Sequence, residues 1–344
     1  MTVRAFAPGR VNLIGEHTDY NDGLCLPFAI AAGVTVTVEA GDDAVLTARA
    51  LDLGEEDAFG VAEPAPAAGW RAFVRGTAAE LARAGHPPRG GTLTIAGDVP
   101  RGGGLSSSAA LGVALALALL AHAGRPAPGR RELARLCSRV ENDWVGARSG
   151  LLDQLAALFG REDHAVRLDL RSLDVAPVPL RLGGWRLVTV DSGVRRDHAA
   201  SGYNERRAEC EAACRMLGVG SLRDVDAAGA AGLPAPLDRR ARHVLEENER
   251  VERAVAALGR GDLPELGRLL DASHASLRDL YEVSVPAGED AVARLKAGGA
   301  AGARVVGGGF GGSVLALFEP GAAPPAGALE VTPGPGARLL EGGA

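Results

Sequence analysis

Residues 97–111, Gly97-Asp-Val-Pro-Arg-Gly-Gly-Gly-Leu-Ser-Ser-Ser-Ala-Ala-Leu111, join a predicted strand (91–95) to a predicted apolar helix (109–123). Backbone N–H groups at a helix N-terminus are unpaired and carry partial positive charge, so they bind phosphate, and glycines let the ligand come close. Serine hydroxyls cap helices and also bind Mg²⁺. We therefore predict a phosphate-binding loop. A capped turn with flexible glycines is the alternative, but it accounts poorly for three glycines and three serines.

The basic residues exclude two common schemes of phosphate binding. Of 37 lysines and arginines, Lys296 is the only lysine, and it lies in a predicted helix far from the first glycine cluster. The Walker A loop needs a lysine directly after its glycines, and protein kinases need one on a strand beside the phosphates. Phosphate chemistry in this chain must therefore use backbone amides, a metal ion or arginine.

A second glycine cluster occupies residues 307–312, Gly-Gly-Gly-Phe-Gly-Gly, and formally matches the dinucleotide-binding pattern GxGxxG. That pattern has meaning only when a helix follows, and here a β-like run, 313–318, follows instead. We therefore reject a nicotinamide-dependent oxidoreductase. We expect a tight loop that closes against the active site, with a plain hairpin turn as the alternative.

Charged residues cluster near the N-terminus, in residues 7–21, Ala-Pro-Gly-Arg-Val-Asn-Leu-Ile-Gly-Glu-His-Thr-Asp-Tyr-Asn. The stretch has little helical or strand periodicity, so we expect a loop. Charges on a glycine-punctuated loop indicate ligand contact, and a solvated loop without function is the alternative. Glu141 and Asp153 lie twelve positions apart and are close enough to flank one site.

Composition indicates a globular protein with a large core. The chain has 344 residues, 47% of them hydrophobic, and a net charge of -6, which disfavours a nucleic-acid-binding surface. We see no signal peptide and expect a cytoplasmic protein; the longest apolar run, 109–121, is too short to cross a bilayer. The four scattered cysteines should be free thiols, although Cys210 and Cys214, one helical turn apart, leave a shared metal as a remote alternative.

The periodicity predicts an α+β fold rather than regular βαβ units. Besides the segments already named, we predict strands at 34–38, 165–169, 185–191 and 304–306, helices at 70–84, 131–143, 203–217, 237–258, 263–280 and 289–297, and an irregular tail. We place one domain boundary near residue 170. This gives an N-terminal domain, 1–170, and a C-terminal domain, 171–344, that carries the loop 307–312.

In their order and spacing, the three clusters resemble the sequence motifs of the GHMP small-molecule kinases. Residues 9–21 resemble the signature of the galactokinases within that family. Further similarities occur at 70–76, 99–110, 141–154, 203–210, 282–286 and 307–312. The resemblance implies a two-lobed fold of mixed sheets and helices, with the active site in the cleft between the lobes. It also implies transfer of the γ-phosphate of ATP to the anomeric hydroxyl of galactose, giving α-D-galactose 1-phosphate and ADP.

The resemblance also implies roles for individual residues. Asp153 matches the catalytic aspartate that accepts the proton of the anomeric hydroxyl, and Arg10 matches the neighbouring arginine that helps neutralise the transferring group. Five residues match family positions that contact the sugar: Glu16, His17, Asp19, Gly150 and Tyr203. A polyol needs several fixed donors and acceptors for its orientation, and these residue types supply them.

The same resemblance implies sites for ATP and Mg²⁺. Glu141 matches the metal-binding carboxylate, with Ser107 as the second protein ligand. The residues implied to bind ATP are Gly102, Gly103, Gly104, Leu105, Ser106, Ser107, Ser108 and Ala109, with Trp70 near the adenine. A core tryptophan is the alternative for Trp70. We expect galactose and ATP as partners, neither nucleic acid nor membrane, and a monomer or weak dimer.

The sequence departs from the family pattern at two places, of which the second bears on specificity. Ala287-Gly288 replace the usual Glu-Leu in what should be a peripheral helix, and Arg195-Arg196-Asp197 replace a histidine-containing run near the expected sugar. We interpret Arg195, His198 and His274 as surface or structural residues. Alternatives to galactose phosphorylation are an anomeric kinase of galactosamine, a uronic acid or a pentose, and a galactose sensor without catalysis.

Overall fold

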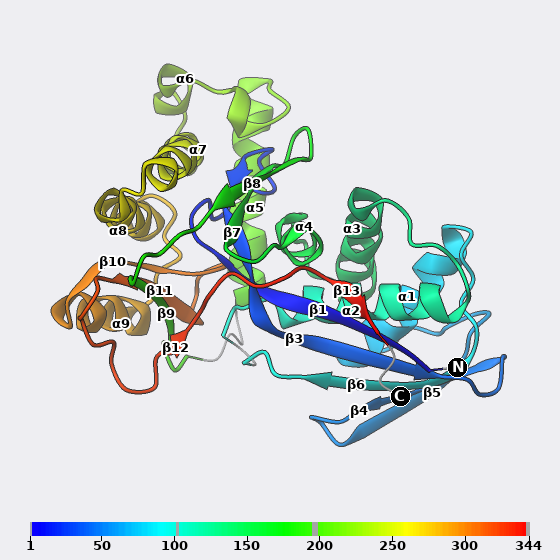
Figure 1. Cartoon of the computed structure of the whole chain (residues 1–344). Helices are drawn as coiled ribbons and strands as arrows, with labels where there is room; N and C mark the ends of the chain where they lie inside the picture. The colour runs from blue at the N-terminus through cyan, green and yellow to red at the C-terminus, as the bar shows by residue number, and fades with distance from the viewer. Residues whose placement is uncertain (1, 101–102, 195–198, 342–344) are drawn as a thin grey trace.

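The computed structural model describes residues 2–100, 103–194 and 199–341, with only the backbone of 199–201. Helices and sheets form two groups of elements, one built on each of two larger sheets, as Figure 1 shows. The α+β class is confirmed. No helix in the described part of the chain combines the length and hydrophobicity that crossing a bilayer requires.

The first group is built on a six-stranded sheet whose strand order is β13-β1-β3-β6-β4-β5. Its strands are β1 (Thr2–Asn12), β3 (Pro27–Glu39), β4 (Val45–Ala50), β5 (Glu55–Gly60), β6 (Gly91–Gly97) and β13 (Arg338–Leu340). Only the pair β4 and β6 is parallel. The strands β1 and β3 pair along almost their whole length, and β3 and β6 lie at the centre of the sheet.

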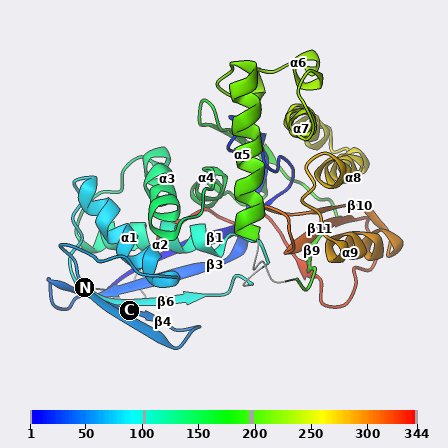
Figure 2. The ribbon, with the colours of Figure 1, turned by 180° about the vertical axis from the view of Figure 1, so that it is seen from behind.

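Helices cover one face of this sheet, as Figures 1 and 2 show. They are α1 (Trp70–Arg83), α2 (Ser107–His122), α3 (Arg130–Arg139), the π-helical segment η1 (Val140–Val145) and α4 (Leu152–Phe159). Helix α2 packs directly on β1 and β3, with α1 and α3 beside it. It is apolar around its whole circumference, which suits a helix enclosed on all sides by other elements.

The second group is built on a four-stranded sheet in the order β10-β11-β9-β12. Its strands are β9 (Arg186–Asp191), β10 (Ala300–Val305), β11 (Ser313–Phe318) and β12 (Leu329–Glu330). The helices of this group are α5 (Ala199–Leu217), the short 3₁₀ helix η2 (Leu222–Asp224), α6 (Ala227–Ala231), α7 (Leu237–Arg260), α8 (Leu263–Asp279) and α9 (Pro286–Ala297). Helices α8 and α9 pack on β10.

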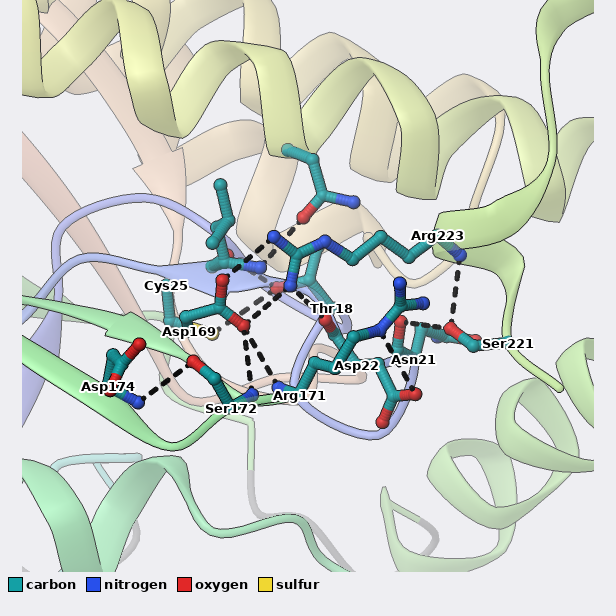
Figure 3. A network of polar contacts seen from close by, with 12 residues as sticks. Thr18, Asn21, Asp22, Cys25, Asp169, Arg171, Ser172, Asp174, Ser221 and Arg223 are labelled. Carbon is teal, nitrogen blue, oxygen red and sulfur yellow. Dashed lines mark hydrogen bonds and ion pairs between the residues drawn. The ribbon is translucent and has the colours of Figure 1, made fainter.

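A small sheet, β2-β7-β8, and a polar network join the two groups. The strands are β2 (Leu24–Cys25), β7 (His164–Asp169) and β8 (Asp174–Pro179). Figure 3 shows Arg223, which donates to both carboxylate oxygens of Asp169 at 2.6 and 2.8 Å and to the carbonyl of Asp22. Ser221 donates to the carbonyl of Asn21. Residues at and next to η2 therefore bind the backbone at the end of the charged N-terminal loop.

Most predicted elements are confirmed, but three expectations are wrong. Residues 7–12, expected as loop, belong to β1, because both faces of the strand are buried from Ala7 onward and leave no alternation to detect. The predicted helix 131–143 changes to π-helix at Val140. The tail is not wholly irregular, since β12 pairs with β9 and β13 with β1.

The chain crosses between the two groups more than once. Side chains of the segment Val11–Ile30 pack with α7 and α8 in one apolar cluster, and β13 returns to the first sheet. The single boundary near residue 170 stays a prediction.

Candidate active site

An irregularity in β1 brings Arg10 to the site. The register between β1 and β3 shifts between Pro8 and Arg10, and such bulges change the direction in which a side chain points. A Cβ on Gly9 would lie 2.6 Å from the carbonyl oxygen of Leu105, so only glycine allows this close approach. Arg10 N–H donates to the same carbonyl at 3.0 Å. The first glycine cluster is thus attached to β1.

Arg10 and Asp153 form an ion pair at the centre of the site. Arg10 Nε donates to Asp153 Oδ1 at 2.6 Å, and Nη1 donates to the carbonyl of Gly104, also at 2.6 Å. Burial acts to lower the pKa of Arg10, but the carboxylates of Asp153 and Glu16 outweigh it and the net shift is upward. Asp153 lies in the first turn of α4, where the helix dipole favours a carboxylate.

The serine run separates into different contacts. Ser106 is the N-cap residue of α2 in a left-handed conformation, but its side chain does not cap the helix; its hydroxyl donates to Asp153 Oδ2 instead. The expected serine cap is therefore absent at Ser106, whose side chain is directed to Asp153 and not to the N–H groups of α2. Within the described part of the chain no side chain caps the first N–H groups of α2, which are therefore available to an anion.

Asp153 and Arg10 line a cavity of about 220 Å³. It contains all five residues for which the resemblance implied sugar contact: Glu16, His17, Asp19, Gly150 and Tyr203. Sequence reasoning assigned no role to five further residues that line the cavity: Ala147, Arg148, Ser149, Leu152 and Asn204. All five lie within the stretches 141–154 and 203–210, whose resemblance to the family was the available signal.

Glu16 is held by the second glycine cluster. The N–H of Gly307 donates to Glu16 Oε1 at 2.8 Å, and Nη2 of Arg304 lies 3.0 Å from the same oxygen. Arg304 is fully buried on β10 and also donates to the carbonyls of Asn12 and Leu13. The loop therefore closes against the site as predicted, and Arg304 is a contact that sequence reasoning missed.

Asp19 is the carboxylate with the most perturbed ionisation in the cavity. Burial, followed by the charges of Asp153 and Glu16, raises its pKa to about 7. Gly150 faces this carboxylate so closely that a Cβ there would lie 2.2 Å from Asp19 Oδ2. The glycine at position 150 thus makes room for Asp19.

His17 and Tyr203 form an aromatic wall. Their ring centroids lie 5.3 Å apart, and a Cβ on Gly308 would lie 2.9 Å from Cδ2 of Tyr203. His17 has a left-handed backbone, φ 61°, a conformation that non-glycine residues adopt rarely and mostly at functional loops. Burial lowers the pKa of His17 well below its ordinary value, so its imidazole is neutral.

Glu141 lies in η1, and π-helical segments often occur at functional sites. It accepts hydrogen bonds from Ser108 at 2.8 Å, Gln154 at 2.7 Å and Ser149 at 3.2 Å. Burial and the charge of Asp153 raise its pKa. A carboxylate with hydroxyl and amide neighbours is the oxygen-rich set that Mg²⁺ prefers, and a cation would relieve the repulsion between Glu141 and Asp153. The residues present therefore fit Mg²⁺.

The two serines next to Ser106 differ from expectation in detail. The serine that contacts Glu141 is Ser108, whereas Ser107 lines a second cavity. Ser107 as the second metal ligand stays a prediction. Of the other predicted loop residues, Leu105 and Ala109 are buried, Gly104 contacts Arg10 through its carbonyl, Gly103 lies near Ser313, and Gly102 lies outside the described residues.

The second cavity, of about 360 Å³, is mostly apolar and borders the N-terminus of α2. Trp70 and Phe73 of α1 line it together with Ser107 and Ser108. Trp70 Nε1 donates to Glu55 at 2.8 Å, which anchors the ring at the cavity edge. An apolar pocket beside uncapped helix N–H groups suits an aromatic base attached to phosphates. Arg195–His198, including the departure at 195–197, lie outside the described residues.

Three family models match the chain: "GHMP kinases N terminal domain" over residues 72–161, "Galactokinase galactose-binding signature" over 2–40 and "GHMP kinases C terminal" over 254–331. Among curated relatives, the galactokinase of Thermotoga neapolitana is 42% identical, covering 93% of this chain and 90% of its own length. That of Streptomyces coelicolor is 44% identical, covering 91% and 84%.

Among solved structures, Lactococcus lactis galactokinase complexed with galactose is 33% identical and superposes with a TM-score of 0.90, covering 98% of this chain and 95% of that chain. Methanococcus jannaschii mevalonate kinase, 17% identical with a TM-score of 0.68, shares the fold. The family models begin at residue 2 and end at residue 331, just after β12. The chain therefore belongs to the galactokinase family of the GHMP kinases.

Proposed function

We propose that this protein is an ATP-dependent galactose 1-kinase that produces α-D-galactose 1-phosphate and ADP. The observation that carries the proposal is the position of the α2 N-terminus between the two cavities. Ser106 contacts Asp153 in the first cavity, while Ser107 and Ser108 line the second. A sugar in the first cavity and a nucleotide in the second would meet at the free N–H groups of α2.

Asp153 is the proposed proton acceptor. It is the carboxylate that both Arg10 and Ser106 orient, and its Oδ1 retains a lone pair beside the bond from Arg10. The proton of the anomeric hydroxyl would move to Asp153 as the oxygen attacks the γ-phosphorus. General-base assistance of this kind contributes roughly 10²–10⁴-fold to a rate.

Arg10 is the proposed electrostatic partner of the transferring group. Its guanidinium contacts both Asp153 and the Gly104 carbonyl of the phosphate loop, so its charge lies between acceptor and donor. Negative charge on the transferring phosphoryl oxygens is stabilised by fixed positive groups that need no rearrangement. This role replaces the lysine that the chain lacks in its loop.

The sugar would be oriented by Glu16, His17, Asp19, Gly150 and Tyr203, which line one cavity. Glu16 is itself immobilised by Gly307 and Arg304, so its free oxygen has a defined direction. Fixed partners on several hydroxyls confer both orientation and discrimination between epimers.

The nucleotide would be held by the N–H groups of α2 and by the apolar cavity that contains Trp70. Glu141, with a neighbouring serine, would hold Mg²⁺. When bound, this ion would neutralise charge on the phosphates of ATP.

The test is release of ADP from Mg·ATP with galactose, glucose, galactosamine, galacturonate or arabinose as acceptor. Wild type is compared with Asp153→Asn, which preserves the shape of the side chain, and with Asp174→Asn as a control on an exposed residue. ³¹P NMR of the product identifies the phosphorylated carbon. The proposal requires galactose 1-phosphate as the fastest product and loss of turnover in Asp153→Asn with nucleotide binding retained.

Other outcomes would contradict defined parts of the proposal. Faster phosphorylation of another sugar at its anomeric carbon would support the kinase class but would show that galactose is not the preferred substrate. Galactose binding without turnover in wild type would identify a sensor.

A further inference from the structure

The ring of His17 has two different environments on its two nitrogens. Nδ1 lies 2.8 Å from the hydroxyl of Tyr20. Nε2 is buried and makes no hydrogen bond within the described residues, although the backbone of Gly308 lies close to the ring, and His17 lines the sugar cavity. An unpaired buried polar atom costs free energy unless a ligand satisfies it. The Nε2 atom is therefore a site for a sugar hydroxyl.

The Tyr20 hydroxyl is the first link of a chain that leads into the C-terminal group of elements. It lies 2.9 Å from the hydroxyl of Tyr281, which in turn lies 3.1 Å from Sγ of Cys210 on α5. Asn21 Nδ2 donates to that sulfur at 3.6 Å. Tyr281 and Cys210 are fully buried, so water does not compete for these bonds. We refer to Tyr20, Tyr281 and Cys210 as the His17 relay.

We propose that Tyr20 and Tyr281 are positioning residues which make His17 present a protonated Nε2 to the sugar. The proposal rests on the proposed function for the identity of the ligand. The role of His17 as a sugar contact follows from the family resemblance, but the assignment of its tautomer and of the relay behind it comes from the contacts in this structure.

Counting hydrogens decides the direction of the relay. The amide nitrogen of Asn21 only donates, so Cys210 Sγ accepts there, and its own S–H faces the hydroxyl of Tyr281. If S–H donates to Tyr281, Tyr281 donates to Tyr20 and Tyr20 donates to Nδ1, every hydrogen in the relay has an acceptor. The opposite direction leaves the thiol hydrogen without an acceptor, whereas Nε2 lacks a hydrogen bond within the described residues in both directions. The first direction is therefore favoured.

Because His17 is neutral, only one of its two ring nitrogens carries a hydrogen. Burial lowers its pKa, and electrostatic interactions with His243, Arg206 and Arg304 act in the same direction, while the backbone contact at Gly308 opposes them. A neutral imidazole carries one hydrogen, and Nδ1 as acceptor places it on Nε2. Besides the cations Arg10 and Arg148, the cavity contains three carboxyl groups, those of Glu16, Asp19 and Asp153, and a donor at His17 complements their acceptor oxygens.

The experiment is a long-range ¹H–¹⁵N correlation spectrum of ¹⁵N-histidine-labelled protein without sugar, with His17→Gln used to identify the His17 signals. We expect the Nε2–H tautomer in wild type, a tautomer mixture in Tyr20→Phe and a smaller change in Tyr281→Phe. Cys210→Ser retains the donor and should keep the wild-type pattern, as should the matched control Cys214→Ser on the neighbouring helical turn. A wild-type Nδ1–H tautomer, or a Tyr20→Phe spectrum identical to wild type, would overturn the proposal.

Kinetics supply the second readout. Because one neutral hydrogen bond to the sugar is weakened, Tyr20→Phe should raise the galactose KM roughly three- to tenfold and Tyr281→Phe less, with kcat within about twofold of wild type. An unchanged KM in Tyr20→Phe would contradict the proposal. Failure of wild type to phosphorylate galactose would instead reject the proposed function, while the spectra would still decide the tautomer.

Discussion

Arg10 Nε lies 2.6 Å from Oδ1 of Asp153, although 143 positions separate the two residues in the chain. The pair joins the bulged strand β1 to the first turn of α4, and Arg10 also binds the carbonyl of Gly104. The bond to Asp153 uses Nε of the guanidinium, and the bond to Gly104 uses Nη1.

The first prediction concerns Arg10→Lys. An ammonium lacks the planar fork that contacts Asp153 and Gly104 together, so we expect kcat/KM to fall roughly 10²–10³-fold with the fold retained. Steady-state kinetics and thermal unfolding measure the two effects. Arg49→Lys is the control, because Arg49 pairs with Glu56 on the exposed surface of the protein. Activity of Arg10→Lys within about threefold of wild type would reject the role assigned to this arginine.

The second prediction is a pH dependence due to Asp19. Its pKa of about 7 in the folded protein lies above the ordinary 3.8, because of burial and of the nearby Asp153 and Glu16. Its contribution to the free energy of unfolding is therefore complete below the ordinary pKa and is lost as the pH rises through about 7. Asp19→Asn carries no titrating group, so its stability relative to wild type should increase between about pH 5 and about pH 8.

Denaturant unfolding at these two pH values measures the effect. The exposed Asp174→Asn should show the same difference from wild type at both values. An Asp19→Asn difference that does not change with pH would mean that Asp19 does not titrate in this range.

The third prediction concerns the buried pair Arg304 and Glu16. Arg304→Met leaves an uncompensated buried carboxylate, and Glu16→Gln leaves a buried guanidinium, so each should lower the free energy of unfolding by about 3–5 kcal/mol. In the double variant neither charge remains, and we expect a coupling energy of about 1–3 kcal/mol. Denaturant titration of the four proteins gives this value.

The matched control is the exposed pair Arg49 and Glu56, whose side chains are 54% and 65% accessible. Its cycle should give about 0–1 kcal/mol. Equal coupling in the two cycles would show that burial adds nothing to the Arg304–Glu16 contact.

The fourth prediction separates the two cavities. Trp70 lines only the apolar cavity beside α2, so Trp70→Ala should raise the KM for ATP roughly tenfold, the order expected for loss of stacking on a base. The KM for galactose should stay within about twofold, since its proposed site lies on the other side of the serine run. Initial rates with each substrate varied in turn measure both constants. An unchanged KM for ATP in Trp70→Ala would exclude Trp70 from the nucleotide site.

The sequence by itself determined the elements with strong local signals. The apolar helix after the glycine and serine run, the strand-loop-strand around 307–312 and the long amphipathic helices of the second half all occur where periodicity and punctuation predicted them. The residues implied to contact the sugar could be selected because their types and order match one family, and five of them line one cavity.

Only the tertiary structure decided which of these residues contact one another. The bulge at Gly9, the bond from Ser106 to Asp153, the Arg304–Glu16 pair and the His17 relay each join segments far apart in the chain. Local periodicity carries no information on such contacts. Strand β13 escaped prediction for the same reason, because a three-residue strand becomes stable only when its hydrogen bonds are completed by β1.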